Sequence, residues 1–266
     1  MGEWPFLAFD AALGAAGAVL GWVATRRLRA RKKTVADAVT VAVTVLSFTV
    51  GGQLLAPRLR DCQEWRQTRA AGRETFGSAR AAALYADTLL PLVHAARLKE
   101  RLASQTTPDA LKAGVAQLTH AGLARLSTDE LERLFDLKRV MAAKSTAACA
   151  GFWTGTLPPA ALAEGLRGLD EDQQRAWITT TGRALELELG AQGESPRLVA
   201  DAVARVTGAL APDGLAAFAA ASKASTLTTV QACATFRAVA DGIKALPPVT
   251  RDLGIRMLTN PELLPP

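Results

Sequence analysis

Three cysteines are the most regularly placed of the reactive residues in this chain of 266 residues. Each begins a Cys-x-x-aromatic element, at Cys62, Cys149 and Cys233. Zinc needs clustered ligands such as paired CxxC motifs, and the sequence has none. Three interpretations stay open. The cysteines could be small buried residues at one recurring packing site, Cys149 and Cys233 could form a disulfide outside the cytoplasm, or a thiol could be reactive.

Two histidines and one acidic cluster are the other candidates for acid–base or metal chemistry. His94 and His120 are 26 residues apart and belong to no HExxH motif. The acidic residues at 170–172 begin an expected helix, where the helix dipole stabilises negative charge. The sequence contains no GxSxG, P-loop or GxGxxG motif. We therefore predict no catalytic residue, no metal ligand and no cofactor, and we favour binding over enzymatic activity without excluding the latter.

The first 57 residues predict a transmembrane helical hairpin. An apolar run at 5–25 contains one charge, Asp10, and a second run at 38–57 contains none. Since a helix rises about 1.5 Å per residue, roughly 20 residues span a hydrocarbon core of about 30 Å. A strongly basic turn at 26–33 joins the two runs and contains Arg26, Arg27, Arg29, Arg31, Lys32 and Lys33.

The basic turn also predicts the orientation of the hairpin, because short loops rich in Lys and Arg stay in the cytoplasm. Both termini and the rest of the chain are then expected in the periplasm. A cleaved signal peptide carries its basic residues before the apolar stretch, whereas here they follow it. Residues 39–45 alternate like a β-strand, but a lone strand cannot satisfy its backbone in lipid, so a helix is expected there.

Each apolar run carries small or polar residues along one helical face. Such residues let helix backbones approach closely, and Thr or Ser can hydrogen-bond across the contact. The faces predict packing of the two helices against each other or, alternatively, against another membrane protein. The residues expected at this contact are Gly14, Gly17 and Gly21 in the first run, and Thr40, Thr44, Ser47 and Gly51 in the second.

The formal net charge of +6 is concentrated beside the predicted membrane segment. Residues 1–57 and 58–80 each carry a net charge of +3, and residues 81–266 are neutral overall. A nucleic-acid-binding protein concentrates its positive charge on a domain face instead. The pattern therefore excludes a nucleic-acid partner and favours contact with anionic lipid headgroups.

Beyond residue 57 the chain predicts an all-α domain, because it is rich in Ala, Leu and Arg. Helix-capping residues followed by Pro or an acidic residue occur at 107–109, 127–130, 170–173, 195–196 and 260–262. After the cap at 127–130 come Leu131, Leu134, Phe135 and Lys138, whose apolar members share one helical face.

The helical domain also predicts an internal duplication. Asp129 precedes Cys149 by 20 residues, and Asp213 precedes Cys233 by the same number. A Leu-Pro-Pro segment and then a Gly-Leu-Arg or Gly-Ile-Arg segment follow each cysteine. The boundaries expected are 1–57 for the hairpin, 58–106 for a helical connector that could be a degenerate repeat, 107–190 for the first repeat and 195–266 for the second.

Together these features predict a membrane-anchored helical scaffold of the bacterial inner membrane, with a periplasmic domain that binds another envelope protein. A bacterial source is inferred from the abundance of Ala and the excess of Arg over Lys. Two alternatives stay open. One is an accessory or immunity-like subunit whose hairpin contacts a membrane complex, and the other is an envelope hydrolase with an unrecognised site.

Overall fold

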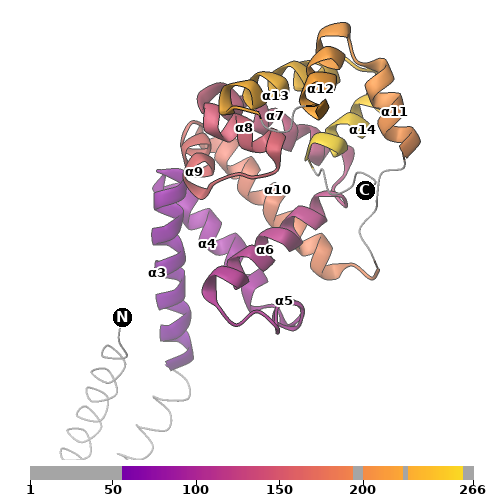
Figure 1. Ribbon diagram of the computed structural model, residues 1–266. Helices are drawn as coiled ribbons and strands as arrows, with labels where there is room; N and C mark the ends of the chain where they lie inside the picture. The colour runs from indigo at the N-terminus through magenta and orange to yellow at the C-terminus, as the bar shows by residue number, and fades with distance from the viewer. Residues whose placement is uncertain (1–55, 194–199, 224–226, 260–266) are drawn as a thin grey trace, which may run out of the picture. The chain divides into compact units, whose positions relative to one another are not determined.

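All regular structure in the described part of the chain is α-helical. The computed structural model describes residues 56–193, 200–223 and 227–259, and no strand occurs among them. The prediction of an all-α fold is therefore confirmed. In chain order (Figure 1), the helices are α3 (Ala56–Phe76), α4 (Ala79–His94), α5 (Ala96–Arg101), α6 (Pro108–Leu123), α7 (Thr128–Lys144), α8 (Thr146–Thr154), α9 (Pro159–Arg167), α10 (Glu171–Gly190), α11 (Ala200–Ala209), α12 (Pro212–Lys223), α13 (Thr229–Lys244) and α14 (Pro248–Thr259).

The predicted hairpin lies outside the described residues, apart from the two positions at which α3 begins. None of the helices in the described ranges is long and apolar enough to cross a membrane. The residues predicted for helix packing and topology also lie outside the described ranges. They are Gly14, Gly17, Gly21, Thr40, Thr44, Ser47, Gly51, Arg26, Arg27, Arg29, Arg31, Lys32 and Lys33.

The chain divides into two compact units, 1–66 and 67–266. Within the second unit, local sequence signals set the helix starts. Thr107, Ser127 and Asp170 each accept a hydrogen bond from a backbone N–H in the first turn of the helix that follows, as their sequence predicts. Ser127 and Asp170 form full capping boxes with Glu130 and Gln173. The acidic cluster at 170–172 therefore begins a helix, as expected.

The core of the second unit is continuous across residues 76–258. Helices α8 and α13 pack side by side in this core, although 84 residues separate their cysteines (Figure 1). Phe152 and Phe236 pack there with ring centroids 5.6 Å apart. A second, smaller cluster joins Leu98 and Leu102 to α10. The regions predicted as separate repeats thus share one buried interior.

Helices α6 and α10 approach so closely that the contact requires a glycine. A Cβ atom added at Gly122 would overlap the main-chain carbonyl group of Ala184.

Close to this contact, the carboxylate of Glu188 is buried and accepts a hydrogen bond from Arg125 Nε at 2.7 Å. A charge-assisted bond of this kind stabilises a carboxylate that burial would otherwise make costly.

We expect Gly122→Ala to lower the free energy of unfolding by about 1–3 kcal/mol, because the added methyl group must push two backbones apart. Gly208→Ala is the matched control, since a Cβ at this helical glycine meets no atom within 4 Å. That control should be neutral or stabilising by up to about 1 kcal/mol. Urea denaturation of both variants measures the difference, and equal stabilities would contradict the close helix contact.

Candidate ligand-binding cavity

A large cavity opens in the second unit between α4, α6 and α10. Its volume is about 1320 Å³, above the range of about 300–1,000 Å³ usual for small-molecule sites. The walls are mainly aliphatic and aromatic, and representative lining residues are Leu89, Leu92, Val115, Trp177, Ile178 and Leu185. The cavity therefore offers an extended apolar surface to a ligand.

Apart from Tyr85, the ionisable side chains that line this cavity in the described structure are basic. Lys99, Lys112 and Lys138 contribute ammonium groups and His120 contributes an imidazole, while the described lining includes no Asp or Glu. Lys99 and Lys112 are exposed, whereas Lys138 is buried. The charge of the cavity is thus complementary to an anion.

Lys138 is the unusual residue of the cavity, because a lysine is almost never this deeply buried without an acidic partner. Its side chain projects from α7 with 8% of the residue exposed. The Nζ atom lies 3.4 Å from the carbonyl oxygen of Thr259 and 5.5 Å from the centre of the Phe152 ring. Burial lowers the pKa of Lys138 from its usual 10.5 to about 8. The amine is still mostly an ammonium ion at pH 7.

Three helices bring Lys138 and His120 to the same acceptor. His120 is in the last turn of α6, and its Nε2 atom lies 3.2 Å from the Thr259 carbonyl oxygen. Thr259 is the last residue of α14, so its carbonyl belongs to the negative end of the helix dipole. The helix end partly compensates the buried positive charge, and the prediction that His120 lies near a helix end is confirmed.

Lys138 is not among the functional residues predicted from the sequence. The signal was present, because Lys138 follows Leu131 by seven residues and Leu134 by four and so falls on the apolar face of α7. A lysine in the middle of a buried stripe, flanked by Met141, breaks the polar–apolar pattern. Such a break indicates either a structural ion pair or a binding site.

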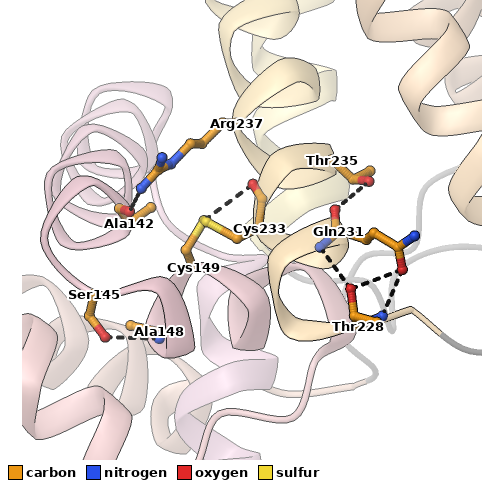
Figure 2. The surroundings of a disulfide bond; sticks show 9 residues. All are labelled: Ala142, Ser145, Ala148, Cys149, Thr228, Gln231, Cys233, Thr235 and Arg237. Atoms are coloured by element: carbon orange, nitrogen blue, oxygen red, sulfur yellow. Dashed lines mark hydrogen bonds between the residues drawn. A yellow bond between two sulfur atoms is a disulfide. The ribbon is translucent and has the colours of Figure 1, made fainter.

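The two cysteines proposed as a pair are joined in the core (Figure 2). The sulfur atoms of Cys149 in α8 and Cys233 in α13 are 2.10 Å apart, and the Cα atoms are 4.9 Å apart. Next to them, the guanidinium of Arg237 donates to the carbonyl of Ala142, which further ties α13 to α7. Cys62 is exposed and free. The idea that all three cysteines occupy one recurring buried site is therefore wrong for Cys62.

The other residues considered for chemistry are not brought together. His94 is exposed at the end of α4, and the acidic residues at 170–172 begin α10. Within the described ranges, no three His, Cys, Asp or Glu side chains are grouped closely enough to hold a metal ion. Among the described residues, the apolar cavity with its buried ammonium group is an arrangement suited to an anionic ligand.

The described residues thus form an all-helical fold with a large, mainly apolar cavity that is open to solvent. Comparison of this chain with protein-family models, curated proteins and solved structures finds no match.

Proposed function

We propose that the protein is a membrane-anchored helical interaction protein of the bacterial cell envelope, with its helical domain in the periplasm. The observation that carries this proposal is the buried Cys149–Cys233 bond. Structural disulfides persist in oxidising compartments such as the periplasm and are rare in the cytoplasm. The same compartment follows independently from the basic turn at 26–33, which favours a cytoplasmic loop between two membrane segments.

The mode of action proposed is binding of another envelope protein by the helical domain. The described cavity brings Lys138 and His120 together without an Asp, Glu, Cys or Ser in its lining, which favours binding over hydrolysis. An accessory subunit that contacts a membrane complex through the predicted hairpin is the second candidate. The small residues of the two apolar runs, such as Gly17 and Thr44, favour it because they allow close helix contacts.

We further propose that the helical domain arose by duplication. Helices α6, α7, α8 and α9 of the first predicted repeat have counterparts of the same order in α11, α12, α13 and α14 of the second, whereas α10 of the first repeat has none among the described residues. The likeness is partial: Leu131 is buried, whereas its counterpart Leu215 is 41% exposed. The disulfide joins equivalent cysteines of the two proposed repeats, as expected for a pair related by an internal two-fold axis.

The topology is tested with reporter fusions at residue 30 and after residue 266. Alkaline phosphatase, which is active only in the periplasm, should be active at 266 and inactive at 30, and a green fluorescent reporter should show the reverse. Replacement of the six basic residues of 26–33 by Gln is the control, because it should abolish the preferred orientation. A cytoplasmic carboxy-terminal reporter in the unaltered chain would refute the proposal.

The choice between the two partner surfaces needs a second experiment. Gly17→Leu with Thr44→Leu alters the predicted membrane face, and Val230→Asp with Val249→Asp alters two valines that are 70% and 76% exposed on the helical domain. If the helical domain binds the partner, the second pair should reduce crosslinking to it and the first should not. The opposite result would support the accessory-subunit candidate.

A further inference from the structure

We infer that the cavity between α4, α6 and α10 binds a long-chain carboxylic acid, whose carboxylate pairs with the buried ammonium of Lys138 and whose alkyl chain lies along the apolar walls. This inference concerns the helical domain alone. It does not depend on the orientation of the chain in a membrane or on the identity of a protein partner.

Among the described residues, the ammonium group of Lys138 is incompletely paired. An ammonium group carries three N–H donors. In the described structure it makes one hydrogen bond, to a neutral carbonyl at 3.4 Å, although a charged N–H donor usually lies about 2.8 Å from its acceptor. A carboxylate in the cavity would supply the missing charge and acceptors. Of the described side chains that line the cavity, none is acidic and could already fill this role.

The polarity of the cavity walls favours an alkyl chain. Residues from α4, α6 and α10, such as Leu92, Val115 and Ile178, belong to the same largely apolar lining as Lys138. Burial of each methylene group on such a surface contributes about 0.8 kcal/mol. A long unbranched alkyl chain uses this surface fully, whereas a small polar acid would leave most of it in contact with water.

The number of charges selects a carboxylate over a phosphate monoester. Lys138 is the one ammonium group that is buried among the described lining residues, so it matches a group with a single negative charge, whereas a dianion needs a second cation at the same depth. The two exposed lysines, Lys99 and Lys112, belong to the same lining and attract an anion toward the cavity. The occupant therefore carries a single negative charge at one end of an apolar chain.

The test uses the full chain in nanodiscs of neutral phosphatidylcholine and palmitate labelled with ¹³C at its carboxyl carbon. Equilibrium dialysis against empty nanodiscs measures the palmitate held by the protein beyond that dissolved in lipid. We expect saturable binding of palmitate, and a ¹³C shift of a carboxylate rather than a carboxylic acid. Hexadecanol, which has the same chain without the charge, should bind about 10- to 100-fold more weakly.

The decisive variant is Lys138→Met, which removes the charge and keeps the length of the side chain. It should weaken palmitate binding by about 10- to 100-fold and change hexadecanol binding little. Lys144→Met is the control, because Lys144 is an exposed lysine on the same helix that does not line the cavity. It should bind both ligands as the unaltered chain does.

Three results would overturn the inference. The first is no excess of palmitate over empty nanodiscs, as would follow if the cavity accommodates a helix of a partner protein instead. The second is equal binding of palmitate and hexadecanol, which would make the site a nonspecific apolar one. The third is equal palmitate binding by Lys138→Met and the unaltered chain, which would place the carboxylate elsewhere.

Discussion

Lys138→Met is expected to raise the free energy of unfolding at pH 7 by about 3 kcal/mol. The pKa of this lysine is about 8 in the folded protein and 10.5 when it is fully hydrated. Each pKa unit corresponds to about 1.4 kcal/mol of difference between the two environments. Burial of the ammonium therefore opposes folding, and methionine fills the same volume without a charge.

The same pKa difference determines how the effect depends on pH. Below about pH 8, Lys138 is protonated in both the folded and the unfolded chain, so the whole cost of burying the charge is present. Between about pH 8 and 10.5 the folded protein releases the proton while the unfolded chain keeps it, and stability rises with pH. The advantage of Lys138→Met should accordingly shrink over this interval and disappear above it.

Urea denaturation of both proteins from pH 6 to 11 measures this difference. Groups that do not interact with Lys138 cancel in the comparison, because both chains contain them. Lys144→Met should change stability by less than about 0.5 kcal/mol at every pH. A Lys138→Met protein less stable than the unaltered chain at pH 7 would contradict the assignment of a costly buried charge.

A lysine that weakens the fold is informative about function. Sites that bind or react commonly keep groups that reduce stability, because the ligand rather than the protein completes their interactions. For Lys138 the missing interaction is an anion, and the ligand inferred above supplies it. Binding of palmitate should therefore stabilise the unaltered chain and leave Lys138→Met nearly unchanged.

The parts of the fold that can be predicted from the sequence are those determined by residues close together in the chain. Ser127 and Asp170 cap α7 and α10 because their side chains reach a backbone N–H three residues away. Such signals are local and can be found without knowledge of the tertiary structure. Thr228 caps α13 in the same way, with Gln231 as the other member of the capping box. This cap is also predictable from the sequence.

The cavity could not be predicted in this way, because its walls come from helices far apart in the chain. Lys138 meets the carbonyl of Thr259, 121 residues later. Whether a lysine on an apolar stripe is buried depends on which helices cover it, and periodicity within one helix does not give that information. A lysine on the apolar face of a helix is unusual in itself. The packing of α7 against α14 buries this lysine and makes it a candidate site.

The Cys149–Cys233 bond gives the second large expected effect. Replacement of both residues by Ala should lower the free energy of unfolding by about 4 kcal/mol, because a crosslink between positions 84 residues apart strongly restricts the unfolded chain. For a domain of this size the melting temperature should fall by about 10 °C. Both cysteines are buried, so a small part of the loss will come from the space that the sulfur atoms leave.

Reduction separates these two contributions. Treatment of the unaltered chain with dithiothreitol under unfolding conditions removes the crosslink and keeps the sulfur atoms, and it should reproduce most of the loss. Cys62→Ser is the matched control, since Cys62 is exposed and free and its replacement should change stability by less than about 0.5 kcal/mol. If the Ala variant and the reduced chain were as stable as the oxidised chain, the bond between α8 and α13 would contribute nothing to the core. The compartment proposed from that bond would then rest on the basic turn alone.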